Sequence, residues 1–225
     1  MIKALIFDLD DTLYYELEYV KSGFRAVSNY ISARYDLSAK DFYNKLLTVL
    51  DEEGRGKTFD LTLAHFGLPG AEVERMVNIY RKHKPDNLRL YPDVERVFAG
   101  LKGNYKLGLI TDGNFTVQWN KIKELGLNKL IEEIIVTDDY GVDRRKPSSF
   151  AYLKLLERFN VNPEEAVYIG DNPEKDFITA RRLGMKTIRI IREKGMYIDK
   201  RLSPEYEADY EINFFSELEK ALKSF

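Results

Sequence analysis

The chain has 225 residues and a formal net charge of −2 from 35 basic and 37 acidic side chains, so its composition indicates neither a nucleic-acid partner nor an anionic membrane. It contains no cysteine, which excludes disulfides and thiolate metal sites. No apolar run approaches the roughly 20 residues of a membrane span, and the N-terminus is not typical of a signal peptide. We therefore expect a cytoplasmic protein, either a monomer or a weak homodimer.

Short β-rich segments alternate with helical patterns along most of the chain. The predicted strands are residues 2–7, 105–110, 133–137, 166–169 and 186–191, and the predicted helices between and around them are 92–102, 115–125, 148–159 and 173–183. The last helix is expected to begin with Asn172 as N-cap and Pro173 at its first position. This alternation predicts an α/β protein with a doubly wound, Rossmann-like parallel sheet.

Residues 14–90 interrupt that alternation. They contain no convincing strand but four helical patterns, at 16–35, 38–52, 58–66 and 70–84. We predict a catalytic core made of residues 1–14 and 91–225, and a helical cap domain made of residues 15–90.

Four short polar motifs follow successive predicted strands. They are Asp8-Leu9-Asp10-Asp11-Thr12, Thr111-Asp112-Gly113-Asn114, Lys146-Pro147, and Gly170-Asp171 with Asp176. Open α/β sheets bind ligands beyond the carboxyl ends of their strands, so one crevice is expected to receive all four motifs. Carboxylates crowded there repel one another, and Mg²⁺ with oxygen ligands would neutralise them. A metal beside a lysine and a threonine hydroxyl would form a cradle for phosphate.

Each motif alone also has a purely structural interpretation. The first could be a loop or half of an EF-hand, although it lacks the glycine that an EF-hand loop requires. Thr111 could cap a turn, Lys146 could be solvated, and Asp171 with Asp176 could favour the N-terminus of a helix. Because the four motifs coincide at successive strand ends, we favour a shared functional site.

The segments FDLDDT, ITDGN, RKP and GDNPEKD resemble the four motifs of the haloacid dehalogenase superfamily. The resemblance extends from Ile2 to about Ile191 and is to the phosphatase branch that carries a helical cap after the first strand. It implies a Mg²⁺-dependent phosphatase acting on small phosphate monoesters, either sugar phosphates or nucleotide-like metabolites.

The resemblance also implies roles for single residues. Asp8 would attack phosphorus and carry the phosphoryl group, and Asp10 would protonate the leaving alkoxide and later deprotonate water. Asp8, Asp10 through its main-chain carbonyl, and Asp171 would hold Mg²⁺, while Asp176 would steady the lysine and the waters of the metal. The remaining expected substrate-binding residues are Thr111, Asp112 through its amide, Gly113, Asn114, Lys146 and, from the cap, Tyr15 and Arg55.

The loop GVDRRKP carries about two more residues before Lys146 than the GVxKP spacing of that family. Lys146 reaches the crevice only if this loop bulges outward. Arg145 is the alternative cation, although a guanidinium does not simply replace an ammonium.

The segment Gly56-Lys57-Thr58 suggests a nucleotide-binding P-loop, which we reject. Asp51 stands where that motif requires its first glycine, and the preceding residues are acidic and helical in pattern. The turn could present Arg55 or Lys57 to a substrate, or it could simply be a solvated connection between helices.

Other functions on the same scaffold stay open. A phosphosugar mutase would need the cap to retain its intermediate, and a sensor would need an inactive site. Asp10 argues against a dehalogenase, because carbon–halogen cleavage produces no alkoxide that needs an acid. The motif pattern is similar to archaeal-type and sugar-phosphatase relatives, including those acting on sialic acid phosphates, but it does not identify the substrate.

Overall fold

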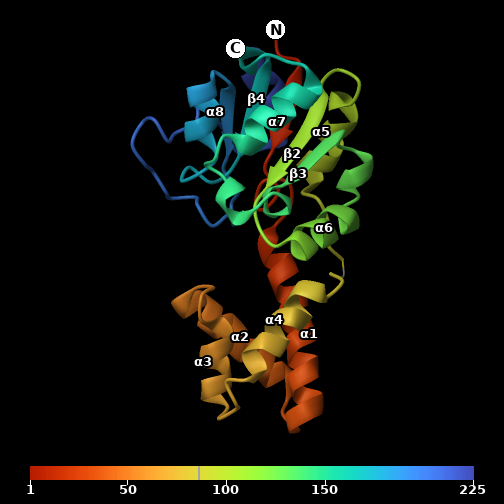
Figure 1. Ribbon diagram of the computed structural model, residues 1–225, viewed down its shortest axis with the longest axis vertical. Helices are drawn as coiled ribbons and strands as arrows, with labels where there is room; N and C mark the ends of the chain where they lie inside the picture. The colour runs from red at the N-terminus through yellow and green to blue at the C-terminus, as the bar shows by residue number, and fades with distance from the viewer. Residues whose placement is uncertain (86) are drawn as a thin grey trace. The chain divides into compact units, whose positions relative to one another are not determined.

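The computed structural model describes residues 1–85 and 87–225 and separates into two compact units (Figure 1). The core unit comprises Met1–Glu16 and Leu88–Phe225, and the helical unit comprises Leu17–Asn87. Asp86, which falls inside the predicted cap range, lies outside the described residues. The core unit extends two or three residues further than predicted because Tyr14 bridges to Leu90, which ties both connecting segments to it.

A six-stranded, fully parallel sheet forms the core unit, in the order β3-β2-β1-β4-β5-β6. This confirms the predicted α/β fold class. The sixth strand was not predicted, since its three residues are too few to show a periodic pattern. The strands are β1 (Ala4–Phe7), β2 (Lys106–Thr111), β3 (Glu133–Val136), β4 (Ala166–Gly170), β5 (Lys186–Ile190) and β6 (Tyr210–Ile212).

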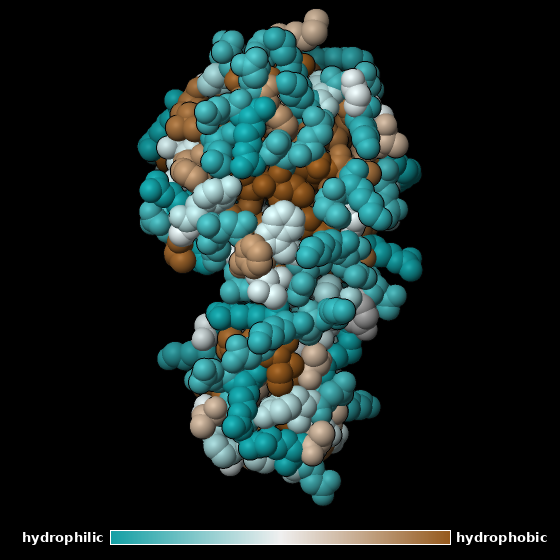
Figure 2. All heavy atoms as spheres, turned by 45° about the vertical axis from the view of Figure 1, so that its right-hand side comes forward, coloured by the Kyte–Doolittle hydropathy of each residue, from teal (hydrophilic) through white to brown (hydrophobic). Residues whose placement is uncertain are grey.

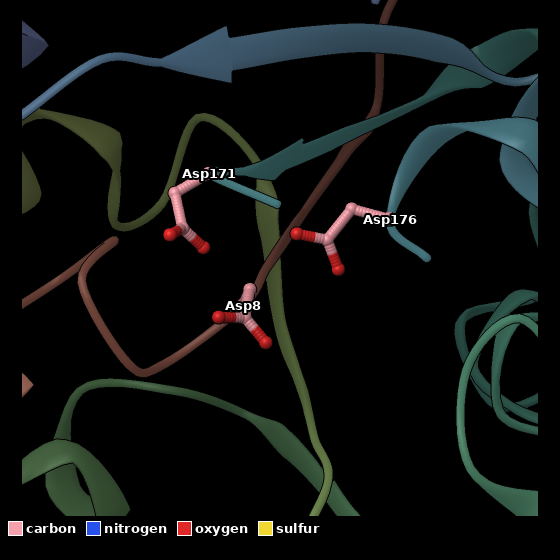
Figure 3. Close-up of side chains that lie close together, drawn as sticks. All are labelled: Asp8, Asp171 and Asp176. Carbon is pink, nitrogen blue, oxygen red and sulfur yellow. The ribbon is translucent and has the colours of Figure 1, made fainter. Parts of the chain in front are cut away.

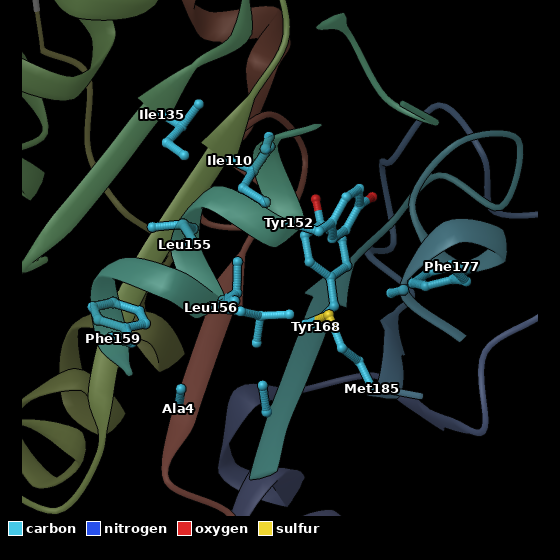
Figure 4. Packing of buried hydrophobic residues seen from close by; sticks show 14 residues of the cluster. Ala4, Ile110, Ile135, Tyr152, Leu155, Leu156, Phe159, Tyr168, Phe177 and Met185 are labelled. Carbon is cyan, nitrogen blue, oxygen red and sulfur yellow. The ribbon is translucent and has the colours of Figure 1, made fainter. Parts of the chain in front are cut away.

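Helices cover both faces of this sheet. They are α5 (Pro92–Leu101), α6 (Phe115–Glu124), α7 (Phe150–Phe159), α8 (Phe177–Leu183) and α9 (Leu218–Leu222). On one face, α7 and α8 pack against the sheet through a cluster that includes Tyr152 and Phe177 (Figure 4). On the other face, the ring of Phe7 packs against Phe98 of α5, with centroids 5.0 Å apart. Alternate residues of β1 therefore serve opposite cores, which explains why the strand is continuously apolar.

The predicted start of the helix after β4 was wrong. Helix α8 begins at Phe177, and the chain from Asn172 to Asp176 forms a loop instead. The side chain of Asn172 accepts a hydrogen bond from the amide of Glu174 at 2.9 Å, and its own amide donates to the carboxylate of Asp176 at 3.0 Å. Asn172 thus stabilises a turn rather than capping the helix.

The helical unit has a core of its own. Its helices are α1, which begins in the core unit (Glu16–Tyr35), α2 (Ala39–Glu53), α3 (Thr58–His65) and α4 (Glu72–Lys82). Phe42 and Leu46 of α2 are fully buried and belong to a cluster with Phe24 of α1 and Met76 of α4. The side chain of Ser38 caps α2 by accepting from the amide of Asp41 at 3.2 Å.

Hydrophilic residues make up most of the visible surface of each unit (Figure 2). No helix among the described residues has both the length and the apolar character of a membrane span.

Glu72, at the start of α4, is a buried charge that joins two helices of this unit. Its carboxylate accepts hydrogen bonds from the hydroxyls of Tyr30 and Tyr35, both at 2.9 Å, and from Arg34 at 3.2 Å. Arg75 completes the set at 2.9 Å. Burial raises the pKa of Glu72, but these donors outweigh it and hold the pKa below its ordinary value.

We expect Glu72→Ala to lower the thermal midpoint of the protein by several degrees, because two tyrosine hydroxyls lose their acceptor. The pKa of Glu72 is depressed in the folded protein. The stability that its carboxylate contributes is therefore fully present above the ordinary glutamate pKa and is lost as the pH falls through the lower pKa of the folded protein. The wild type and the variant should therefore converge in stability in acid. Glu74→Ala, at an exposed position of the same helix, is the matched control; equal losses in both variants would contradict the assignment.

Candidate active site

The carboxyl ends of three neighbouring strands bring the first, second and fourth motifs together. Phe7 of β1 pairs with Leu109 of β2 and with Ile169 of β4, so the three strands end at nearly the same level. The amide of Asp8 continues this pairing by donating to the carbonyl of Ile169 at 2.8 Å. The sheet register therefore places Asp8 centrally at the carboxyl edge of the sheet, which is the catalytic edge that the sequence predicts.

Three buried carboxylates form a cluster at this edge. Asp8, Asp171 and Asp176 each offer an oxygen, and these oxygens all lie within 4.8 Å of one another (Figure 3). The residues are 4%, 7% and 0% exposed, respectively. The carboxylate of Asp10 is not part of the cluster, which leaves its main-chain carbonyl as the group that would bind metal.

Lys146 reaches this cluster across the long loop. Its ammonium donates to Asp8, to Asp176 at 2.8 Å and to the hydroxyl of Tyr168 at 2.9 Å. Two single-turn 3-10 helices, Thr137–Asp139 and Val142–Arg144, lie in this loop before Lys146.

Arg145, the alternative cation, lies elsewhere. Its guanidinium forms two hydrogen bonds with Asp138, each 2.6 Å long, on an exposed part of the loop. Lys146 is therefore the cation that the loop delivers to Asp8.

The side chain of Asp10 lies in a separate polar pocket. It accepts hydrogen bonds from the ammonium of Lys121 at 2.8 Å, from the amide of Gln118 at 3.0 Å and from the hydroxyl of Tyr14. Gln118 also donates to the hydroxyl of Thr111, which is 1% exposed. The side chain of Gln118 on α6 thereby links Asp10 and Thr111 by hydrogen bonds.

Gln118 and Lys121 were not foreseen from the sequence. They lie three residues apart on α6 and are 1% and 3% exposed, so they share its inward face. Two polar residues on the buried side of a helix indicate a polar site there, but the sequence alone does not show which side of the helix is buried.

This pocket also affects the ionisation of Asp10. Burial raises the pKa of its carboxyl, but Lys121, Tyr14 and Gln118 outweigh that effect and hold the pKa below its ordinary value. The arrangement favours the carboxylate, the form that the expected base step needs. The expected acid step needs the protonated form, which this arrangement disfavours.

Asp112 binds the loop that carries Lys146. Its carboxylate accepts from the hydroxyl of Thr137 at 2.9 Å, from the amide of Lys146 at 3.1 Å and from the ammonium of Lys175 at 3.2 Å. Lys175 was likewise not foreseen. Asn114 caps α6 by accepting from the amide of Val117 at 3.4 Å, and its expected contact with substrate stays a prediction. Gly113 adopts a φ of 131°, a conformation that favours glycine.

The two residues expected from the cap lie in different units. Tyr15 belongs to the core unit and lines a pocket of about 470 Å³ with Tyr91, Arg96 and Arg192. Arg55 belongs to the helical unit and lines a mainly apolar cavity of about 310 Å³ there. Their contacts with substrate stay predictions.

The charge balance of the carboxylate cluster fits a divalent cation. Burial and the neighbouring Asp176 raise the pKa of Asp8 to about 7, although Lys146 lowers it. Burial, Asp8 and Asp176 raise the pKa of Asp171 well above its ordinary value. A hard ion with oxygen ligands would relieve this repulsion, so the residues present fit Mg²⁺.

A family model of the haloacid dehalogenase-like hydrolases matches residues 5–190. The chain therefore belongs to this family, as its motifs indicated. It is 36% identical over 220 residues to a glyceraldehyde 3-phosphate phosphatase of Methanopyrus kandleri, covering 93% of this chain and 94% of that protein. It is also 36% identical over 230 residues to a glyceraldehyde 3-phosphate phosphatase of Methanocaldococcus jannaschii, covering 100% and 98%. The crystal structure of a HAD phosphatase from Thermococcus onnurineus matches with a TM-score of 0.65 and 28% identity, covering 98% of each chain.

We expect Mg²⁺ to stabilise the folded protein, by about 2.7 kcal/mol at a hundredfold excess over its dissociation constant. Asp171→Asn should raise the thermal midpoint measured without divalent cations, because it removes a repelling carboxylate, and should abolish most of the shift that Mg²⁺ produces. Asp143→Asn, at an exposed carboxyl outside the cluster, should change neither value. An undiminished Mg²⁺ shift in Asp171→Asn would place the metal elsewhere.

The pH dependence should follow from Asp8. The pKa of Asp8 is raised in the folded protein from 3.8 to about 7. The stability that its protonated form contributes is therefore fully present below pH 3.8 and is lost as the pH rises through about 7. Without divalent cations, the wild type should therefore lose more stability between pH 4 and pH 7 than Asp8→Asn does. Thermal unfolding across this range, in buffers free of divalent cations, measures the difference; identical profiles would contradict the assignment.

Proposed function

We propose that the protein is a Mg²⁺-dependent phosphatase that hydrolyses small phosphate monoesters through a phosphorylated Asp8. The observation that carries the proposal is the division of the carboxylates at the catalytic edge. Asp8 belongs to the buried cluster and contacts Lys146. Asp10, two residues further along the chain, lies outside the cluster among polar side chains of its own. Such a division supplies a nucleophile and a separate proton-transfer group, which is what a two-step displacement needs.

In the first step, an oxygen of Asp8 forms a bond to phosphorus while the bond from phosphorus to the substrate oxygen breaks. The leaving alkoxide takes a proton from Asp10. In the second step, water attacks the same phosphorus, Asp10 takes a proton from that water, and the bond to Asp8 breaks to release inorganic phosphate. Lys146 orients Asp8 and partly neutralises it throughout.

The other groups of the site bind and position the phosphoryl group. We assign the Thr111 hydroxyl and the Asp112 amide to its oxygens, with Gln118 holding the Thr111 hydroxyl in place. Mg²⁺, held by Asp8, Asp171 and the main-chain carbonyl of Asp10, would supply positive charge that neutralises the transferring group. Asp176 steadies Lys146 through its 2.8 Å ion pair.

The neighbours of Asp10 favour hydrolysis over the alternatives. A dehalogenase has no use for an acid at that position, yet three side chains hold the carboxylate of Asp10 in place. A sensor without activity would not need this second carboxylate either. The two archaeal relatives named above are phosphatases by name, which further supports hydrolysis over phosphosugar transfer.

Those relatives also indicate the substrate class. Both are named for glyceraldehyde 3-phosphate, and each aligns with more than nine-tenths of this chain. We therefore propose short sugar phosphates, three-carbon ones first, as the substrates. A panel of triose, tetrose and hexose phosphates with nucleoside monophosphates, assayed with Mg²⁺, should rank the trioses highest by kcat/KM. A clear preference for nucleotides would contradict the substrate class while leaving the chemistry intact.

Asp8→Asn should lower phosphatase turnover by several orders of magnitude, because an amide cannot form the phosphoenzyme. Excess EDTA should silence the wild type, and added Mg²⁺ should restore it. Circular dichroism should show that the variant is folded, and Asp143→Asn serves as the control for substitution of a remote carboxyl. Retention by Asp8→Asn of more than about a tenth of the wild-type rate would remove Asp8 from this role.

A further inference from the structure

The ammonium of Lys146 is fully occupied. It has three N–H donors, and its three acceptors are Asp8, Asp176 and the hydroxyl of Tyr168. Its side chain is 0% exposed. To donate to a substrate oxygen, Lys146 would have to give up one of these partners, the neutral hydroxyl of Tyr168 at the least cost. A cation with unused donors would add to the positive charge that Mg²⁺ and Lys146 bring to an incoming phosphate.

Lys175 is the second lysine at this edge. Its ammonium lies 3.2 Å from an oxygen of Asp112, and its side chain is 31% exposed, in contrast to that of Lys146. Within the described part of the chain, Asp112 is its one hydrogen-bonded carboxylate partner. Lys175 thus keeps N–H donors and solvent access that Lys146 lacks, beside the motif that is assigned to phosphate binding.

The loop that carries Lys175 is held in place on both sides. The amide of Asp176 donates to the carbonyl of Asn172 at 3.1 Å, and the hydroxyl of Tyr152 donates to the carbonyl of Asp176 at 3.0 Å. Glu174, the residue before Lys175, forms an ion pair with Lys200. The backbone of Lys175 is therefore fixed while its side chain stays partly exposed, an arrangement that suits a preorganised anion site.

Resting on the function proposed above, we propose that Lys175 is a further substrate-binding residue, whose ammonium contacts the oxygens of the phosphoryl group in addition to Lys146, which also positions Asp8 and Asp176. The ligand class is a phosphate monoester or inorganic phosphate. The carboxylates of Asp8, Asp112, Asp171 and Asp176 lie at this edge, as do the ammonium groups of Lys146 and Lys175. Loss of Lys175 would remove one of these two positive charges and leave the incoming phosphate with Mg²⁺ and Lys146.

The test measures binding of inorganic phosphate, by calorimetry with saturating Mg²⁺, to the wild type and to Lys175→Met. The dissociation constant should rise roughly ten- to hundred-fold, as for loss of a charge-assisted hydrogen bond. Lys175→Arg should keep most of the affinity. Lys200→Met removes a cation that binds the same loop but lies on its exposed side, and it should bind phosphate like the wild type. Equal losses in Lys175→Met and Lys200→Met would overturn the proposal in favour of a loop effect.

A double-mutant cycle separates direct contact from an effect through Asp112. If Lys175 only holds Asp112, then Lys175→Met should have no further effect on phosphate affinity in an Asp112→Asn background, which would overturn the proposal. Direct contact predicts that most of the loss persists there.

A chemical rescue gives an independent readout. The chain contains no cysteine, so Lys175→Cys can be alkylated at that position alone. Aminoethylation restores an ammonium and should restore phosphate binding, whereas carboxamidomethylation, which adds no charge, should not. Equal binding by the two adducts would contradict a role for the charge.

Failure of this proposal can be distinguished from failure of the proposed function. A wild type that neither binds phosphate nor hydrolyses any phosphate monoester would overturn both. A wild type that does both, with an unchanged phosphate affinity in Lys175→Met, would overturn only the assignment of Lys175.

Discussion

The active edge of this protein depends on the contact between Lys146 and the carboxylates of Asp8 and Asp176. Three carboxyl groups with oxygens within 4.8 Å of one another are held in a buried region, where their mutual repulsion is strong. The enclosed ammonium of Lys146 offsets part of that repulsion and uses all its donors to do so. The remaining imbalance fits the site to Mg²⁺, and the role proposed for Lys175 is to contact an anionic ligand beside it.

The second organising feature is the separation of Asp8 from Asp10. Residues two apart in an extended chain point the same way, but the strand ends at Phe7, and the chain turns beyond it. The side chain of Asp10 thereby enters the pocket formed by Gln118 and Lys121 of α6. Two carboxyl groups close in sequence thus acquire different partners and opposite pKa shifts.

The helical unit is stabilised by different interactions from those at the catalytic edge. Its stability comes from an apolar cluster joined to a buried charge, Glu72, whose hydrogen bonds are all made within the unit. Since each unit has its own core, substitutions in the helical unit can change its apolar cavity without disturbing the carboxylate cluster. This division suits a family in which one catalytic edge serves different substrates.

The sequence by itself determined the α/β fold and the gathering of Asp8, Thr111 and Asp171, because strand ends in a parallel sheet meet at one edge. It did not determine the start of α8, where the side chains of Asn172 and Asp176 stabilise a loop that local capping rules misassign. It left open whether Lys146 or Arg145 enters the site, since only the packing of the loop decides between adjacent cations. Gln118, Lys121 and Lys175 emerged only from the tertiary structure, because their roles depend on which side of α6 is buried and on how the loop after β4 is held.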